Sequence, residues 1–216
     1  MSEKCVVILS GGTDSSTVAY WAKDRGYEVH AVTFDYGQLA KVEIQHAAKI
    51  TEKLGIEHLI IDLSELKTIY EGITSLVDES IPLTSEFTEP IIVPFRNGVF
   101  IAVAVAYAVS IGSNHIFYGA HASDENSYPD CRKEFFKAFE KAAQLGTELP
   151  IQIDAPFSEQ PKTELLKKGI ELGVPYELTW SCYTGCPIHC GECESCNNRK
   201  KAFTESGITD KTNYLK

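Results

Sequence analysis

One stretch near the start of the chain restricts the possible folds more than any other part of the sequence. The apolar run Cys5-Val6-Val7-Ile8-Leu9 leads into Ser10-Gly11-Gly12-Thr13-Asp14-Ser15-Ser16 and then into a helical pattern. The apolar run predicts a buried parallel strand, and the two glycines allow a tight turn at which the backbone approaches a ligand. Because a helix N-terminus presents unpaired N–H groups, this strand, turn and helix predict an anion site.

The loop at residues 10–16 resembles the SGGxDS signature of the PP-loop ATP pyrophosphatases. It is not a Walker A loop, which needs a lysine near its end, because no lysine lies between Lys4 and Lys23. The resemblance implies that ATP binds here by its β- and γ-phosphates and that AMP is transferred to a substrate. We expect Asp14 to hold Mg²⁺ on the phosphates, since carboxylate oxygen is a ligand that this ion prefers. The expected ATP-binding residues are Ile8, Leu9, Ser10, Gly11, Gly12, Thr13, Asp14, Ser15, Ser16, Thr17, Val18 and Asp35.

Alternation of apolar runs and helical patterns predicts the fold class. Strands are expected at 5–9, 28–35, 58–62, 115–118 and 151–155, and helices at 16–25, 41–54, 97–111, 133–145 and 161–172. A β-α-β-α-β order predicts an α/β fold with a doubly wound parallel sheet, in which ligands bind at the carboxyl ends of the strands. We expect an ATP-binding domain at 1–179 and a small metal-binding segment at 180–216, with a surface loop or lid at 78–90.

Composition and charge limit the possible partners. The chain has 216 residues and a formal net charge of −10, which argues against broad binding of nucleic acid or an anionic membrane. The apolar stretch at 99–111 is too short to span a bilayer and is expected to be a buried helix. No signal peptide precedes the first strand, so we expect a cytoplasmic protein.

Five of the seven cysteines follow Trp180, which favours a metal site over disulfides in a cytoplasmic chain. Cys190, Cys193 and Cys196 have the spacing C-x2-C-x2-C, which can place three sulfurs around one ion. Tetrahedral zinc needs a fourth ligand, for which the candidates are Cys182, Cys186 and His189. An iron–sulfur cluster is the rival, but the cysteine that precedes a proline lies on the wrong side of the triplet for a ferredoxin.

Several segments together resemble the 7-cyano-7-deazaguanine synthase family, over residues 6 to about 203. The matching segments are SGGTDSS at 10–16, DYGQ at 35–38, RN at 96–97, YPDCR at 128–132, and WSCY with CGECESC between 180 and 196. The resemblance implies one zinc ion on Cys182, Cys190, Cys193 and Cys196, and a homodimer. It implies conversion of 7-carboxy-7-deazaguanine and ammonia to the nitrile, through an adenylated acid and an adenylated amide.

The candidate catalytic residues are Asp14, Ser10, Arg96 and Lys162. The candidate substrate-binding residues are Arg96, Asp124, Tyr128, Asp130, Cys131 and Arg132. Arginine can grip a carboxylate or phosphate with a bidentate fork, and an aspartate can accept hydrogen bonds from a guanine-like edge. For each charged residue the alternative is an ordinary surface or turn role, and His121 is a further candidate for proton transfer.

The sequence departs from the family pattern at Leu39-Ala40, at Phe95 and at residues 124–127. These departures keep open a rival in which the activated acid is joined to a protein amine instead of ammonia. Two further rivals are a tRNA-modifying thiolase, which the net charge opposes, and a nucleotide sensor without catalysis.

Overall fold

The computed structural model describes residues 2–122 and 128–216, which form a parallel sheet with helices on both faces. Every described strand pair is parallel, and the strand order is β3-β2-β1-β4-β5. The strands are β1 (Lys4–Ile8), β2 (Glu28–Asp35), β3 (Glu57–Asp62), β4 (His115–Tyr118) and β5 (Gln152–Asp154). The chain therefore runs outward from β1 to one edge and then from β4 to the other, which confirms the predicted doubly wound sheet.

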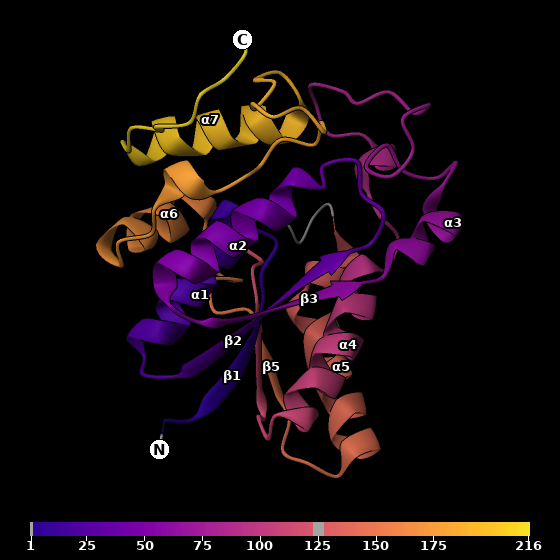
Figure 1. Ribbon diagram of the computed structural model, residues 1–216, viewed down its shortest axis with the longest axis vertical. Coiled ribbons are helices and arrows are strands. Elements are labelled where there is room, and N and C mark those ends of the chain that lie inside the picture. Colours follow the sequence, from indigo (N-terminus) through magenta and orange to yellow (C-terminus); the bar gives the residue numbers. More distant parts are fainter. Residues whose placement is uncertain (1, 123–127) are drawn as a thin grey trace.

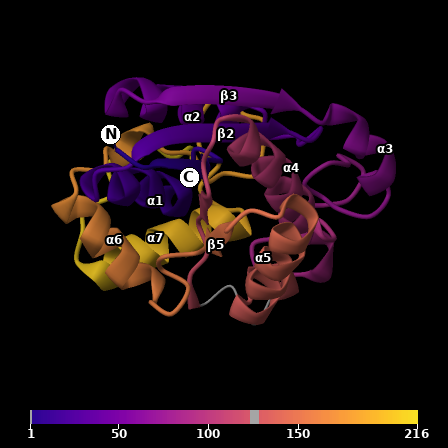
Figure 2. The same ribbon diagram turned by 90° about the horizontal axis from the view of Figure 1, so that it is seen from below.

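Helices cover the two faces of the sheet in two groups (Figures 1 and 2). One face carries α1 (Thr13–Asp24), α2 (Val42–Leu54) and α6 (Lys162–Glu171), and α7 (Glu194–Ser206) packs against α6. The other carries α4 (Arg96–Ser110) and α5 (Lys133–Thr147), and the four-residue α3 (Lys67–Tyr70) follows β3. Short 3-10 turns occur at η1 (Ser64–Leu66), η2 (Glu89–Ile91), η4 (Pro129–Cys131) and η5 (Tyr176–Leu178).

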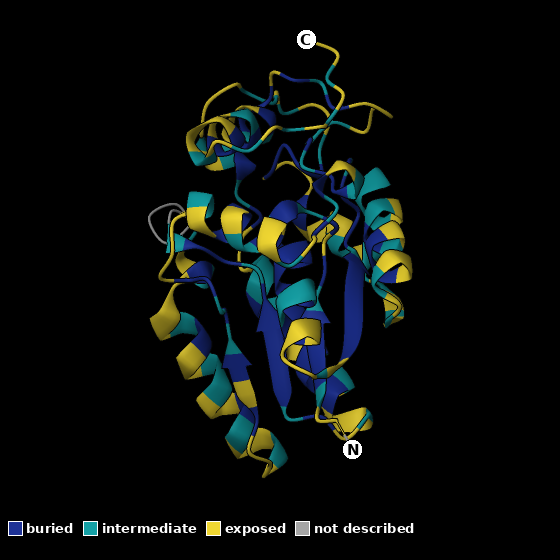
Figure 3. Ribbon diagram, turned by 90° about the vertical axis from the view of Figure 1, so that its left-hand side faces the viewer, coloured by how far each residue is buried: buried dark blue, intermediate teal, exposed yellow. Residues whose placement is uncertain are grey.

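Side chains of β1 alternate between two hydrophobic cores. Cys5 and Val7 pack in the core beneath α1 and α2, whereas Val6 packs in the core beneath α4 and α5. Because β1 is covered on both faces, its residues read as one continuous apolar run. Figure 3 shows this arrangement, with buried strands between helices whose outer faces are exposed.

The apolar helix α4 belongs to this core. A stretch from Glu89 to Ser110 is apolar and long enough to cross a membrane by composition alone. In the fold, Phe100, Ile101, Ala104 and Ala108 of α4 are buried in the core on one face of the sheet. Packing on the sheet therefore accounts for the apolar character of α4, as the sequence predicted.

The topology places the glycine loop at the point where strands begin to be added on the other side of β1. The loop follows β1, and β1 lies between β2 and β4, from which the two halves of the sheet extend. The end of β4 approaches the loop so closely that a Cβ on Gly119 would lie 2.7 Å from the backbone nitrogen of Ser15. Ligands of doubly wound folds bind in the crevice at this switch point.

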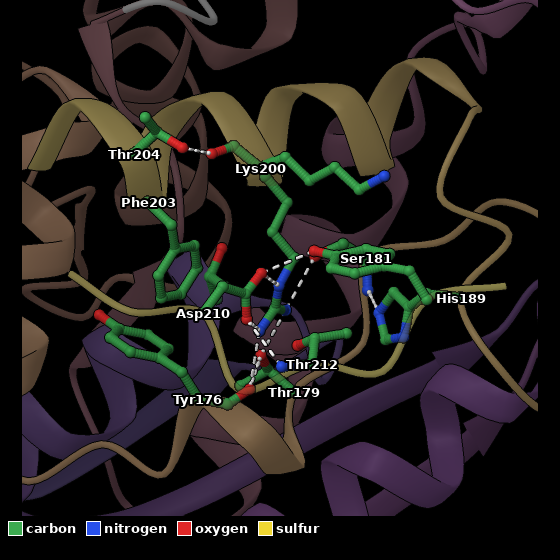
Figure 4. Close-up of polar contacts among 12 residues, drawn as sticks. Tyr176, Thr179, Ser181, His189, Lys200, Phe203, Thr204, Asp210 and Thr212 are labelled. Carbon is green, nitrogen blue, oxygen red and sulfur yellow. Dashed lines mark hydrogen bonds and ion pairs between the residues drawn. The ribbon is translucent and has the colours of Figure 1, made fainter. Parts of the chain in front are cut away.

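The C-terminal segment, residues 180–216, is fastened by one buried ion pair (Figure 4). Arg199 on α7 is 1% exposed and donates to both carboxylate oxygens of Asp210, at 3.1 and 3.3 Å. It also donates to the carbonyl oxygen of Tyr176 at 2.9 Å and to the hydroxyl of Thr179 at 2.8 Å. One guanidinium therefore joins α7, the chain end and the turn that precedes the segment.

Candidate active site

A cavity of about 810 Å³ opens beside the glycine loop, and side chains from distant parts of the chain line it. At one end lie Ser10, Thr13, Asp14 and Ser15 of the loop and the start of α1. Other lining residues come from α2, from the start of α4, from residues 128–131, from the start of α6, and from α7. The cavity thus joins the expected phosphate site to most of the expected substrate residues.

Hydroxyl groups hold the glycine loop in shape. The hydroxyls of Ser10 and Ser15 lie 3.0 Å apart, and the N–H of Ser10 donates to the Ser15 hydroxyl at 3.2 Å. The N–H of Gly12 donates to the Ser10 hydroxyl at 3.3 Å. Among the described residues, no side chain caps α1, whose N-cap residue is Gly12. The first-turn N–H groups of α1 thus have no side-chain cap, which leaves this helix end suited to an anion.

Gly11 is the position in the loop at which only glycine fits. Its φ of +81° lies in the left-handed region. A Cβ there would lie 2.5 Å from the carbonyl oxygen of Glu43 and 2.7 Å from the nitrogen of Ala47, both on α2. On its other side, the carbonyl of Gly11 accepts the N–H of Trp180 at 2.8 Å. Gly11 is therefore packed between α2 and the C-terminal segment.

Asp14 forms the charged centre of the phosphate end. Its Oδ2 lies 2.9 Å from Nζ of Lys162 and 3.9 Å from Nε2 of His121, and Thr13 donates to its Oδ1 at 3.2 Å. Burial alone would raise the pKa of Asp14, but the charges of Lys162 and His121 and the hydrogen bonds lower it below its usual value. Asp14 is therefore ionised at neutral pH and suited to hold a cation.

Arg96, at the start of α4, is the second charged side chain of the cavity. Arg96 donates to the hydroxyl of Tyr36 at 3.1 Å, and its guanidinium carbon lies 5.9 Å from the ring centroid of Phe100. Burial alone would lower the pKa of Arg96, but the hydroxyl of Tyr36 and the carboxylates of Glu43 and Asp130 raise it. Arg96 is therefore a fixed positive charge in the cavity and suited to a carboxylate or phosphate.

Residues 128–131 place a carboxylate, a phenol ring and a thiol beside the start of α4. Asp130 accepts the backbone N–H of Asn97 at 3.0 Å, and the amide of Asn97 donates to the sulfur of Cys131 at 3.3 Å. Tyr128 lies edge-to-face with Phe87, with ring centroids 5.9 Å apart. All of these except Pro129 line the cavity.

The cysteine cluster lies next to the cavity. The sulfurs of Cys182, Cys190, Cys193 and Cys196 all lie within 4.8 Å of one another. The pairs Cys190–Cys196 and Cys182–Cys193 are 3.9 and 4.0 Å apart. A tetrahedral site with Zn–S bonds of about 2.3 Å has sulfurs about 3.8 Å apart. The four thiols can therefore hold a tetrahedral metal ion.

The two other candidate ligands do not join this cluster. Cys186 is exposed. The Nε2 atom of His189 accepts the N–H of Ser181 at 3.1 Å, and its ring packs on Trp180 with centroids 4.0 Å apart. Burial and the charge of Arg199 lower the pKa of His189 to about 4, so this imidazole is neutral. His189 therefore supports the segment through its ring.

Comparison with known proteins identifies the family of the chain. The family model of the queuosine biosynthesis protein QueC matches residues 4–207. The chain belongs to the QueC family. Its curated relatives cover nearly the whole chain. The 7-cyano-7-deazaguanine synthase of Thermoplasma acidophilum is 44% identical over 99% of this chain and 93% of its own length. The enzyme of that name from Archaeoglobus fulgidus is 43% identical, over 96% and 88%.

Solved structures of more distant proteins have a fold similar to that of this QueC family member. A 4-thiouridine synthetase, in complex with RNA and with bound ATP, has a TM-score of 0.58 at 20% identity, over 95% of this chain and 50% of that one. The NH3-dependent NAD synthetase of Campylobacter jejuni has a TM-score of 0.52 at 18% identity, over 82% and 67%. At these identities the likeness shows the fold alone, a parallel sheet with helices on both faces.

Some residues that the sequence singled out lie away from the cavity of this QueC family member. Thr17 and Val18 are buried in α1, and Ser16 and Gly11 are buried without lining the cavity. Arg132 is exposed and does not line the cavity either. Asp124 lies outside the described residues. The roles expected for these residues stay predictions.

Asp35, expected at the nucleotide, is engaged in its own turn. Its Oδ1 accepts the N–H of Gly37 at 3.0 Å, and its Oδ2 lies 2.8 Å from Nζ of Lys41. Asp35 does not line the cavity. Its position at the end of β2 made it a candidate, but the turn that follows β2 directs its carboxylate to Gly37 and Lys41.

Several polar residues that line the cavity of the QueC family member were not predicted as site residues from the sequence. Glu43 on α2 has a partly buried carboxyl that accepts from the amide of Gln38 at 2.9 Å. Tyr183, Glu194 and Asn198 come from the C-terminal segment, for which the sequence predicts a metal site and no contact with the substrate. Position after a strand end could have suggested Glu43, because it follows the DYGQ motif by five residues.

Proposed function

We propose that the chain is an ATP-dependent carbon–nitrogen ligase that converts 7-carboxy-7-deazaguanine and ammonia to 7-cyano-7-deazaguanine. One observation carries the proposal: a single cavity joins an SGGxDS loop to an arginine and an aspartate suited to an acid and a guanine-like edge. The name shared by the curated relatives supports the choice of substrate. The product would serve as a queuosine precursor, in line with the description of the family.

The first half of the reaction activates a poor electrophile. The substrate carboxylate attacks the α-phosphorus of ATP, pyrophosphate leaves, and an acyl-adenylate remains. Negative charge gathers on the phosphoryl oxygens in this step, so the N–H groups at the start of α1 and the ammonium of Lys162 can stabilise the transition state. Arg96 would hold the carboxylate in line with the α-phosphorus.

The second half installs the nitrogen and then makes the nitrile. Ammonia adds to the acyl carbon and AMP leaves, which gives the amide. A second ATP adenylates the amide oxygen, and loss of AMP from that carbon gives the nitrile. Two molecules of ATP are therefore consumed for each nitrile. Asp130 and Tyr128 would bind the deazaguanine ring throughout, by hydrogen bonds and by ring stacking.

Magnesium fits the phosphate end by the chemistry of its donors. Asp14 is ionised, and the neighbouring hydroxyl of Thr13 supplies a further oxygen. The ion would neutralise phosphate charge when ATP is bound. Zinc fits the four thiols, because a closed set of four sulfurs is typical of structural zinc. We further propose a cytoplasmic homodimer with no nucleic-acid partner, in line with the net charge of −10.

The test is incubation of the purified protein with 7-carboxy-7-deazaguanine, ATP, Mg²⁺ and ammonium, followed by mass spectrometry. We expect the amide to form first, then the nitrile, with AMP and pyrophosphate released in equal amounts. A deazaguanine mass attached to a lysine of a partner protein would support the rival acceptor. Formation of no AMP with any of these substrates would contradict the proposal and favour a nucleotide sensor.

Replacement of Asp14 tests the assignment of the phosphate end. Asp14→Ala removes the carboxylate that would hold the cation, so ATP–pyrophosphate exchange in the presence of the acid should fall by roughly a thousandfold or more. Asp24→Ala is the matched control, because Asp24 ends the same helix and is exposed. Exchange in Asp14→Ala at the wild-type rate would remove the glycine loop from the mechanism.

A further inference from the structure

Glu43 has a carboxyl group that takes no part in the proposed binding of phosphate by the glycine loop. It lies on the first turn of α2 and lines the cavity. Its own carbonyl oxygen would touch a Cβ on Gly11, so its backbone adjoins the glycine loop. The charge of Arg96 on α4 acts on its carboxyl. Glu43 therefore adjoins the loop expected to bind the phosphates and lines the same cavity as the arginine expected to hold the acid.

The surroundings of Glu43 fix one carboxyl oxygen and leave the carboxyl able to change its charge. The amide of Gln38 donates to Glu43 Oε1 at 2.9 Å and to the carbonyl of Phe34 at 3.2 Å, while its own oxygen accepts the N–H of Tyr36. Gln38 is thus held on three sides and presents a donor to Oε1. The other carboxyl oxygen is the one that can carry a proton.

Charge and burial set Glu43 apart from the other carboxyl groups of the cavity. Burial raises the pKa of Glu43 to about 7, with Arg96 and Gln38 opposing the rise and Asp35 adding to it. The pKa of Asp14 is lowered, and its carboxylate is paired with Lys162. Among the described residues that line the cavity, Glu43 is the carboxyl for which a raised pKa is found. A base with a pKa near the working pH is the most effective proton acceptor.

We propose that Glu43 is the general base that accepts the N–H protons released when the nitrogen is installed and the nitrile is formed. This inference rests on the proposed function. When ammonia adds to the acyl-adenylate, the nitrogen lone pair forms the C–N bond and the C–O bond to AMP breaks, with both electrons leaving on AMP. The added nitrogen must then lose one proton, and Glu43 takes it and passes it to water.

The nitrile step makes a similar demand. The O-adenylated amide carries a cationic NH₂ group and must lose two protons. The first leaves to water and gives a neutral imidate. Glu43 takes the second, the N–H electrons form the third C–N bond, and the C–O bond breaks with AMP as the leaving group. His121 is less suited to this task, because its Nε2 lies 3.9 Å from Asp14 Oδ2 at the phosphate end.

Glu43→Gln separates the two halves of the reaction. The glutamine keeps the size of the side chain and an oxygen that can accept from Gln38, but it cannot take a proton. Nitrile formation should fall by at least about a hundredfold, whereas acid-dependent ATP–pyrophosphate exchange, which releases no N–H proton, should change by less than about threefold. Glu52→Gln is the matched control, because Glu52 is exposed on the same helix.

The pH profile supplies a readout that a purely structural role would not move. In the wild type, nitrile formation at saturating free ammonia should rise with pH through neutrality, as Glu43 loses its proton, while exchange should lack this limb. The titratable groups that interact electrostatically with Glu43, and could therefore shift this limb, are Arg96, Tyr36 and Asp35. In Glu43→Gln the limb should disappear, and in Glu43→Ala added formate should restore part of the rate.

Two results would overturn the inference. One is an equal loss of exchange and nitrile formation in folded Glu43→Gln, which would make Glu43 a residue that positions ATP or Arg96. The other is a wild-type profile that is flat through neutrality, which needs no variant at all. Wild-type protein without any acid-dependent exchange would instead refute the proposed function, so the two failures are distinguishable.

Discussion

The glycine loop and the C-terminal segment both line the cavity, but they are stabilised by different means. The loop lies between β1 and α1, and Val7 of β1, Val18 of α1 and the intervening Leu9 are buried in a large apolar core. In the segment, the buried cluster consists of Trp180 and three of the cysteines, and one ion pair fastens α7. Hydrophobic burial is spread over many residues, whereas sulfur ligands and a buried charge pair depend on few.

This difference means that single changes should act on the two regions unequally. A change in the loop leaves the surrounding core in place, so it should alter chemistry more than stability. A change in a cysteine or in Arg199 removes one of the few interactions that hold the segment in place. Because Glu194 and Tyr183 line the cavity, disorder in the segment should also reach the active site.

Metal removal should give the largest effect. Cys193→Ser takes away one sulfur of the four, and binding of structural zinc is worth about 10–16 kcal/mol in small zinc domains. We expect loss of the bound metal and rapid hydrogen exchange across α7, with α1 still protected. Cys186→Ser is the control, because Cys186 is exposed and lies outside the cluster. Bound metal and slow exchange of α7 in Cys193→Ser would show that the thiols do not support the segment.

Replacement of Arg199 should give the next largest effect. Arg199→Met leaves Asp210 partly buried without its partner, and breaking a buried ion pair typically costs about 3–5 kcal/mol. Asp210 would still accept from Tyr214 at 2.6 Å and from the N–H of Thr212 at 3.0 Å. Urea unfolding should therefore show this loss chiefly in the segment, and the affinity of the four thiols for a metal ion should fall. The exposed Lys201, also on α7, provides the control Lys201→Met.

The same contrast explains what the sequence could predict. Strands such as β4 were predicted to the residue, because apolar runs bounded by turns identify buried strands. The helix α7 was missed, because residues 194–206 are mostly polar and the buried face is made by Arg199, Ala202 and Phe203. Periodicity of apolar residues does not reveal a helix whose central buried side chain is an arginine.

The residues of the candidate active site also differ in whether the sequence could predict them. The loop residues of a known motif could be named from the sequence, and Arg96 and Lys162 both line the cavity. Asp35 could not be judged, because a turn of three residues decides where its carboxylate points. Glu43 follows the DYGQ motif closely in the sequence, but it stands between Val42 and Ile44 in a helical pattern, and only the fold shows that it lines the same cavity as Arg96.

The smallest expected effect is the change in the free energy of unfolding at acid pH that is due to Asp210 in the C-terminal segment. Burial alone would raise the pKa of Asp210, but Arg199, Tyr214 and Thr212 lower it below its unfolded value. A carboxyl with a lowered folded pKa stabilises the protein above its unfolded pKa of about 3.9, and that stability is lost as the pH falls through the folded value. We expect the free energy of unfolding to fall more steeply below about pH 4 in the wild type than in Asp210→Asn, because the variant has already lost this contribution.

Both proteins contain the same cysteines, so protonation of the thiols affects them alike. The difference between the two curves therefore isolates the contribution of Asp210. Parallel curves would contradict this account and would mean that the carboxylate of Asp210 contributes no more to the folded state than an amide does.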